Sequence, residues 1–600
     1  MDDMARSRIS AACLTVFAAL CAAPPAIPSG VYFVDGASRS CSDSGPGNVS
    51  VPYCTISAAV KARGGPSTSI YVRPGVYREE VDIRSSGRAR MPLALFALGS
   101  RVIVDGADDF STPSLWLPLS GAVWCDSAVT WNVQQVLVDG VRLALPADST
   151  ASLTPGQFRY VAGAGLEVNL GGDNPGTRRT LVGRRDHGFF LSGASWVRIE
   201  GFEVIRTEDK GIFAADSSND VTIKNNRVTF CANHGIAAIN SSRLMIESNV
   251  ASDNGFHGIA LISGVNGSRI KNNQAFRNAR PAIREANGIY VFASPANRLE
   301  RNKVHDNQDS GVNIQSGSDG CISAENLSWN NGDHGFFHLY TTGVLNIGNV
   351  AWRNSSNGFS AEGQSNGTRI LDCIAVDNGL ATDKFDLYVD TTSTAGLVSN
   401  YNIFWNSTGQ DIIKYGPDRY STVSAFTTTG QDSQSIQADP NFIDPAAGDF
   451  HLRTGSPAID SGTSASAEWP AVDADGRSRQ DDPASPNVGT GPVPYADRGA
   501  LEYLPLGIPG QLLPGRPNPF NPETEIDYSI GTPGFVEVNV FGISGSLVRT
   551  LVRGYEAPGD HSVIWFGDDD HGRRLPSGTY FCRIQAAGGF RETRRLVLLR

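Results

Sequence analysis

A glycine-centred motif recurs through the middle of the chain and constrains the fold more than any other feature. Its copies read DKGIF, NHGIA, FHGIA, ANGIY, DSGVN, DHGFF and SNGFS, and they are centred on Gly211, Gly235, Gly258, Gly288, Gly311, Gly335 and Gly358. They follow one another at about 23 residues, with one longer interval that contains the insertion ARPAIREA. This period is too short for a helical hairpin, and the apolar residues after each glycine alternate as in strands. The repeat therefore predicts a solenoid in which each copy is one coil.

Two asparagine columns accompany the glycines. The first contains Asn226, Asn249, Asn273, Asn302, Asn326 and Asn349. The second contains Asn254, Asn278, Asn307, Asn331 and Asn354, with Cys231 in place of asparagine once. Stacked coils hold equivalent residues about 4.8 Å apart, so buried asparagines can hydrogen-bond from coil to coil as a ladder. Glycine supplies the turn conformation that admits the next strand.

These columns resemble those of the right-handed parallel β-helix superfamily of secreted carbohydrate-binding proteins and sugar hydrolases, which includes pectate-lyase-like enzymes. The resemblance implies an all-β fold: a right-handed parallel β-helix at 29–504, followed by a small C-terminal Ig-like β-sandwich. The segments TISAAVKA and VRPGVYREE resemble the opening of such proteins, and DPNFIDPAAGDFHLRTGSPAID resembles their closing segment. The expected parts are an N-terminal cap at about 31–80, a β insertion at about 110–185, regular coils at about 190–410 and a closing segment at about 435–504.

The inserted segment carries its own resemblance. From Gln134 onward it is similar to a small β insertion found in several β-helix glycoside hydrolases that act on xylosides, fucosides or galactosides. After a Pro/Gly-rich linker at 505–516, the stretches PNPFNPETEIDYSI and RETRRLVLLR resemble the Ig-like sorting domain of type IX-secreted proteins, at 517–600. This implies the outer-membrane secretion machinery as a partner.

The N-terminus also indicates export. Arg6 and Arg8 precede the apolar run ISAACLTVFAALCAA, which predicts a signal peptide at 1–28; an N-terminal anchor is the alternative. We therefore expect a secreted or outer-membrane cell-surface protein, with a disulfide between Cys41 and Cys54. The net charge is −11 and no Lys/Arg block occurs, which argues against nucleic acid as a partner. Polysaccharide is the expected partner, and the chain is expected to be a monomer.

Two acids define the candidate catalytic site. Asp309 and Asp333 precede the glycines of adjacent coils, so their Cα atoms should lie about 5 Å apart. Their repulsion should raise at least one pKa. A retaining glycosidase has its nucleophile and acid/base about 5 Å apart, and His334 stands beside Asp333. The same pair could hold Ca²⁺, the one cofactor the sequence indicates; no metal ligand set is predicted. The alternative is that these groups decorate a solvated turn.

Candidate substrate-binding residues lie on neighbouring coils. If the apolar residue after each glycine points inward, alternation sends Tyr290, Phe292 and Phe337 outward, where they would offer exposed platforms for sugar rings. Arg284 and His257 complete the predicted substrate-binding set. Alternatively, the insertion ARPAIREA folds over the aromatic residues. The same alternation sends His338 inward.

The sequence favours an enzyme, most simply a glycoside hydrolase. One alternative is a Ca²⁺-dependent lyase acting on uronate-containing glycans, which needs a basic residue to remove a proton; Arg280, Arg284, Lys303 and Lys384 are the candidates. The other alternative is a non-catalytic surface or adhesion protein that binds glycans.

Overall fold

The structure is a computed structural model, and it describes residues 30–99, 101–148, 150–280, 283–503, 510–531, 533–556, 559–570 and 572–599. The predicted signal peptide and residues 505–509 of the predicted linker lie outside the described residues. Among the described residues, no helix is long and apolar enough to cross a membrane.

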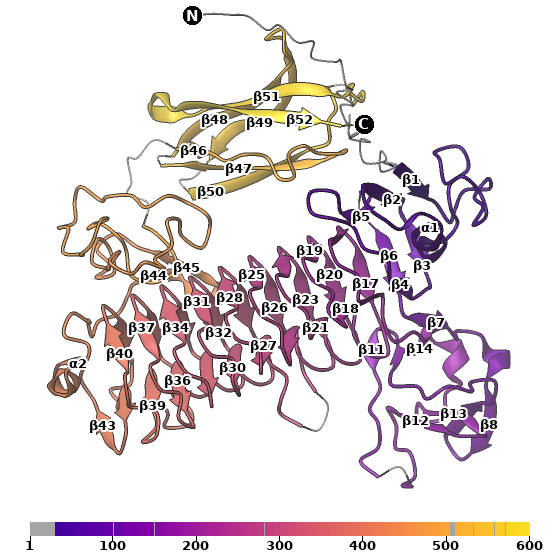
Figure 1. The fold of residues 1–600 in the computed structure, drawn as a ribbon, viewed down its shortest axis with the longest axis horizontal. Helices are drawn as coiled ribbons and strands as arrows, with labels where there is room; N and C mark the ends of the chain where they lie inside the picture. The colour runs from indigo at the N-terminus through magenta and orange to yellow at the C-terminus, as the bar shows by residue number, and fades with distance from the viewer. Residues whose placement is uncertain are drawn as a thin grey trace, which may run out of the picture.

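The predicted all-β solenoid is confirmed. It consists of three long parallel sheets, and each regular coil contributes one strand to each of them (Figure 1). We call them sheets A, B and C. Sheet A contains β1 (Gly30–Val34), β2 (Thr68–Val72), β5 (Leu93–Ala97), β16 (Val197–Glu200), β19 (Thr222–Lys224), β22 (Met245–Glu247), β25 (Arg269–Lys271), β28 (Arg298–Glu300), β31 (Ile322–Ala324), β34 (Leu345–Ile347), β37 (Arg369–Leu371) and β40 (Val398–Asn400).

Sheet B contains β3 (Gly75–Tyr77), β6 (Val102–Asp105), β17 (Glu203–Ile205), β20 (Arg227–Thr229), β23 (Val250–Ser252), β26 (Gln274–Phe276), β29 (Lys303–His305), β32 (Leu327–Trp329), β35 (Val350–Trp352), β38 (Ile374–Val376) and β41 (Ile403–Trp405). Sheet C contains β4 (Val81–Ile83), β15 (Phe189–Ser192), β18 (Ile212–Ala215), β21 (Ile236–Ile239), β24 (Ile259–Ile262), β27 (Ile289–Phe292), β30 (Val312–Gln315), β33 (Phe336–Leu339), β36 (Phe359–Glu362), β39 (Leu387–Val389), β42 (Ile413–Tyr415) and the antiparallel β43 (Asp418–Tyr420).

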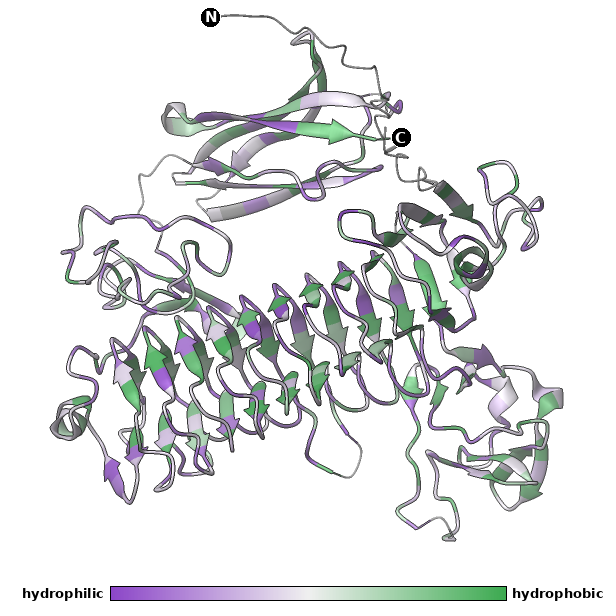
Figure 2. Cartoon of the chain, viewed as in Figure 1, coloured by the Kyte–Doolittle hydropathy of each residue, from purple (hydrophilic) through white to green (hydrophobic). Residues whose placement is uncertain are grey.

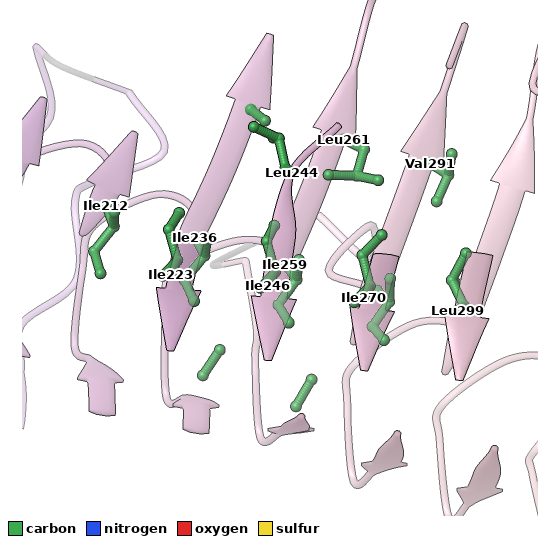
Figure 3. Packing of buried hydrophobic residues seen from close by; sticks show 14 of the residues in the cluster. Ile212, Ile223, Ile236, Leu244, Ile246, Ile259, Leu261, Ile270, Val291 and Leu299 are labelled. Atoms are coloured by element: carbon green, nitrogen blue, oxygen red, sulfur yellow. The ribbon is translucent and has the colours of Figure 1, made fainter. Parts of the chain in front are cut away.

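Apolar and polar residues alternate along the coil strands (Figure 2), and the apolar ones fill the interior. The residue after each motif glycine points inward, as predicted: Ile212, Ile236 and Ile259 are fully buried and stack in a row (Figure 3). His338 is also fully buried, which confirms its predicted inward orientation. Each fully buried aliphatic side chain contributes roughly 1.5–3 kcal/mol, so the repeated column stabilises the whole stack.

Both asparagine ladders are present. In the first, the Asn302 Nδ2 donates to Asn326 Oδ1 at 2.8 Å and to the carbonyl of Ile270 at 2.8 Å. In the second, the Asn307 Nδ2 donates to Asn331 Oδ1 at 3.0 Å. Cys231 stands at the start of the second ladder, where its backbone N–H still donates to Asn254 Oδ1 at 3.1 Å. The ladders pair amide groups that would otherwise be buried without partners.

The ends of the stack are covered. Helix α1 (Ile56–Arg63) begins at the N-cap Thr55 and buries Ile56 and Val60 in the core at the N-terminal end. The predicted disulfide between Cys41 and Cys54 is present beside it. At the other end, the short helix α2 (Val423–Phe426) buries Phe426 in the same core.

The inserted segment forms two antiparallel sheets with a core of their own. Their strands are β7 (Ala107–Asp109), β10 (Val136–Val138), β11 (Val141–Arg142) and β14 (Thr180–Gly183) in one sheet, and β8 (Leu117–Ser120), β9 (Val123–Asp126), β12 (Gln157–Val161) and β13 (Gly165–Asn169) in the other. The Arg142 guanidinium donates to the backbone carbonyls of Cys231 at 3.0 Å and Asp253 at 3.4 Å, which fastens the insertion to the coils.

After the last coil the chain folds back along the side of the β-helix (Figure 1). Its hairpin, β44 (Phe442–Asp444) and β45 (Asp449–Leu452), packs Phe450 against Trp329, with ring centroids 5.3 Å apart. The buried Arg479 pairs with Glu325 of the coils and with Glu502 at 2.9 Å.

The C-terminal domain is a β-sandwich around Trp565. Its strands are β46 (Gln511–Leu512), β47 (Thr524–Ile530) and β50 (Gly559–Trp565) in one sheet, and β48 (Gly534–Phe541), β49 (Leu547–Glu556), β51 (Gly578–Gln585) and β52 (Arg591–Leu598) in the other.

Candidate active site

The turn that leads into sheet C brings Asp309 and Asp333 together on adjacent coils. The N–H of Asp333 donates to the carbonyl of Asp309 at 3.2 Å, and the two carboxyl groups also share a hydrogen bond. Burial, and then the negative charge of Asp333, raise the pKa of Asp309 to about 7. The predicted rise of one pKa in the pair is therefore confirmed. A carboxylic acid that keeps its proton near neutral pH can act as a general acid.

Arg284, from the insertion ARPAIREA, lies over the acid pair. Its Nη2 is 3.3 Å from Asp333 Oδ2, and its Nε is 3.8 Å from Asp309 Oδ1. Its Nη1 also donates to the carbonyl of Gly332 at 3.0 Å, which fixes the guanidinium against the turn. The insertion thus contributes a cation to the acid pair. The nearby Arg280 instead covers the ring of Phe256 at 4.8 Å.

His334 is buried beside the pair. Its Nδ1 accepts from the N–H of Asn357 at 3.3 Å, and burial lowers its pKa to about 4. The imidazole is therefore neutral at neutral pH, with the proton on Nε2. That Nε2 lies 3.7 Å from Asp333 Oδ1 and 3.8 Å from Glu362 Oε1. His334 thus holds an N–H between two carboxyl groups.

Glu362 belongs to this cluster, although the sequence analysis did not select it. It ends β36 on the outer face of sheet C and accepts from the Ser360 hydroxyl at 2.7 Å. Burial raises its pKa. It continues the outward column that holds Phe292, Gln315 and Leu339. An acid in that column one coil after Asp333 was the signal in the sequence that could have identified it.

Two buried polar atoms near the pair have no hydrogen-bond partner among the described residues: Ser310 Oγ and Asn313 Oδ1. Ser310 follows Asp309 directly, and Asn313 stands opposite Phe337 on the next strand of sheet C. A buried polar atom without a partner costs about 1–3 kcal/mol. Both atoms are covered by the protein, so this cost belongs to the local packing of the turn and the strand.

The three predicted aromatic platforms, Tyr290, Phe292 and Phe337, are half-buried. Two of them have one ring face covered by a histidine. The ring of Tyr290 stacks on His257 with centroids 4.2 Å apart, and the ring of Phe337 stacks on His334 at 4.4 Å. Phe292 follows Tyr290 at 6.0 Å. This differs from the expected freely exposed rings. His257 covers Tyr290 from the preceding coil, and His334 covers Phe337 from the turn of the same coil.

His257 differs from its predicted substrate-binding role. It is buried, its Nδ1 accepts from the N–H of Asn287 at 3.0 Å, and burial lowers its pKa. His257 therefore packs against the inner face of the Tyr290 ring and is not accessible to a ligand. The structure brings Asp309, Asp333, His334 and Arg284 together, whereas His257, Tyr290 and Phe292 lie on the coils that precede them.

A second charged cluster occupies the N-terminal coils of sheet C. His187 lies 3.3 Å from Glu80 and 3.5 Å from Asp209, and Lys210 lies 2.5 Å from Asp209. Although burial opposes it, the contacts with Asp209 and Glu80 raise the pKa of His187. The acids and bases of this cluster neutralise one another, so it is a weaker candidate for a catalytic site than the acid pair. No group of three potential metal ligands occurs among the residues that the structure describes.

The comparisons with known proteins agree with this architecture. Residues 139–275 and 276–428 match the family model of a right handed beta helix region, and residues 531–589 match that of the FlgD Ig-like domain. The protein is thus a right-handed parallel β-helix protein with a C-terminal Ig-like domain. The type IX sorting role of that domain remains a prediction. No curated protein matches the sequence.

Solved structures share the fold at low sequence identity. The complex of XylC with xylose has a TM-score of 0.51 at 13% identity, over 94% of this chain and 100% of that one. A glycoside hydrolase structure has a TM-score of 0.45 at 10% identity, over 64% of this chain and 94% of that one. Pectate lyase Pel9A has a TM-score of 0.41 at 15% identity, over 80% and 98%. At 13% identity the likeness to the XylC structure shows the fold alone.

Proposed function

We propose that the chain binds polysaccharide along the outer face of sheet C and hydrolyses a glycosidic bond there. Asp309 is the acid and Asp333 the nucleophile. The observation that carries this proposal is the geometry of the pair: adjacent coils hold Asp309 and Asp333 in contact under Arg284. Burial and Asp333 raise the pKa of Asp309 to about 7, which agrees with its role as the acid. Two carboxyl groups in one site, one protonated and one ionised, are what glycoside hydrolysis requires.

The chemistry follows from the spacing of the coils. Adjacent coils hold the two Cα atoms about 4.8 Å apart. The carboxyl groups share a hydrogen bond, so they must separate to the about 5–5.5 Å of a retaining glycosidase when the sugar enters. Asp309 donates its proton to the glycosidic oxygen as the C–O bond breaks, and Asp333 forms a bond to the anomeric carbon. Water then attacks the anomeric carbon while Asp309 takes its proton, and the bond from that carbon to Asp333 breaks, which releases the sugar and restores both side chains. Arg284 orients Asp333 through its contact at 3.3 Å.

The fold shared with XylC, whose structure contains xylose, supports a glycoside as the substrate class. The export signal and the sorting-domain resemblance support a secreted or cell-surface location, with the secretion machinery as a partner, and a monomer is proposed.

A lyase acting on uronate-containing glycans is the second candidate. It is favoured by the cations near the pair, Arg284 and Lys384, whose charges both act on His334. Such cations could neutralise a uronate carboxylate while a base removes the neighbouring proton. Ca²⁺ could serve the same purpose on Asp309 and Asp333. A non-catalytic glycan-binding role requires only the partly exposed rings of Tyr290, Phe292 and Phe337.

The test is incubation of the purified protein with neutral and acidic polysaccharides, with and without EDTA, while reducing ends and ultraviolet absorbance are followed together. Reducing ends without absorbance, lost in both D309N and D333N, support hydrolysis. The matched control is D306N, which changes an exposed aspartate on the same coil and should keep full activity. Absorbance from an unsaturated product would replace hydrolysis with the lyase reaction. Neither signal on any substrate would leave binding alone.

A further inference from the structure

A cavity of about 210 Å³ lies between the outer face of sheet A and the segment that folds back along it. On the coil side it is lined by Arg269, Arg298, Glu300 and Arg301, and on the other side by Trp469. Sheet A is a different face of the solenoid from the one that carries the acid pair. The volume is below the roughly 300–1,000 Å³ of pockets for drug-sized ligands, so the occupant is small.

The charges of the lining do not cancel. Arg269 and Arg298 both pair with Glu300, and Arg298 also lies 2.7 Å from Glu468. Glu325, which also lines the cavity, pairs with Arg479, whose guanidinium covers the ring of Trp469 at 4.8 Å. These acids are therefore satisfied.

Arg301 is the surplus cation. Among the residues that the structure describes it forms no ion pair, and its guanidinium approaches the turn at Gly476 in the closing segment. Burial, and then the charge of Arg301, lower the pKa of Lys271, although the charges of Glu247 and Glu300 oppose this shift. Arg301 and Lys271 are therefore close enough for their positive charges to act on each other. A local excess of positive charge is notable in a chain with a net charge of −11, because it attracts anions at one place only.

We propose that this cavity binds one oxyanion-bearing sugar unit of an acidic glycan, through a carboxylate or a sulfate ester. Arg301 contacts the oxyanion, Arg269 and Arg298 flank it, and Trp469 packs against the sugar ring. Arginine suits this role because its planar donor fork matches carboxylate and sulfate oxygens. The site would hold a glycan on the protein independently of any cleavage on sheet C.

The test is calorimetric titration of the full-length protein with glucuronate, glucose 6-sulfate, inorganic sulfate and glucose. We expect both anionic sugars to bind, glucose not to bind, and the affinity to fall with ionic strength. R301Q should weaken binding by about ten-fold or more, since a charge-assisted hydrogen bond is lost. R301K, which keeps the charge, should retain part of the affinity.

The control is R369Q, because Arg369 lies in the same column of sheet A as Arg269 and Arg298 but outside the cavity. It should bind as the wild type does. Equal affinity of R301Q and wild type, or no binding of either anionic sugar, would overturn the proposal. Binding of inorganic sulfate without either sugar would show a free-ion site and overturn the assignment to a glycan. Unchanged thermal unfolding of R301Q excludes loss of structure as the cause.

Discussion

The backbone N–H of Asp333 donates to the carbonyl of Asp309 at 3.2 Å, so one coil's acid is held directly above the other's. The solenoid enforces this relationship, because the strands that follow, β30 and β33, are in parallel register. The register keeps the two Cα atoms on adjacent coils, so the carboxyl groups remain neighbours and separate only by rotation of their side chains. Their repulsion is therefore built into the fold, and the proton on Asp309 relieves it.

The stability of the protein should carry the signature of this repulsion. The pKa of Asp309 is raised to about 7 when folded, whereas it is about 3.9 when unfolded. The folded state then binds more protons, so stability falls as pH rises from about 4 through 7. D309N should remove the penalty and increase the free energy of unfolding by about 1–2 kcal/mol at pH 8. At pH 3.5 the effect should vanish.

Thermal unfolding at pH 3.5 and pH 8 measures the difference, with D306N as the control that should show none. A stability of D309N equal to wild type at both pH values would mean that the two carboxylates do not repel each other in the folded protein.

The pH dependence of cleavage should report the same group. If Asp309 is the acid, kcat/KM falls as pH rises through about 7, where the acid loses its proton. Arg284 lowers the pKa of Asp309, so R284Q should move the alkaline limb upward by about half to one pH unit. The control is R280Q, on the same insertion, whose arginine pairs with Glu285 instead. An alkaline limb that stays in place in R284Q would remove Arg284 from the site.

The sequence predicted the parts of this site that depend on the repeat. The period placed Asp309 and Asp333 on adjacent coils, and alternation sent His338 inward. The repeat did not predict that Arg284 lies over the two acids or that His257 is buried, because both depend on how the insertion folds against the coils. Glu362 was overlooked because its proximity to His334 requires the side-chain directions of two strands. The charge of the cavity on sheet A depends on a contact between segments far apart in the chain.

The asparagine ladder should be essential to stability. Asn302 is fully buried, and its side chain both donates to Asn326 Oδ1 and accepts from Asn273 Nδ2 at 3.0 Å. N302A would leave several buried groups on two coils unpaired and should cost about 2–4 kcal/mol. Q274A, an exposed position next to Asn273, should change stability by less than about 0.5 kcal/mol. Chemical denaturation measures both, and equal stabilities would show that water replaces the ladder.

Arg479 should hold the folded-back segment on the solenoid. Its side chain is only 5% exposed and pairs with Glu325 and Glu502, which are 2% and 0% exposed. R479M would leave two buried acids without their cation, and removing one partner of a buried ion pair costs about 3–5 kcal/mol. Since burial already raises the pKa of Glu325 to about 8, protonation should recover part of the loss. We therefore expect R479M to be less destabilised at pH 5 than at pH 9, as measured by thermal unfolding.

The double variant R479M/E325Q should regain stability at pH 9, because the amide carries no charge to compensate. A loss that is independent of pH and is not reduced by E325Q would mean that Arg479 acts through packing on Trp469 alone.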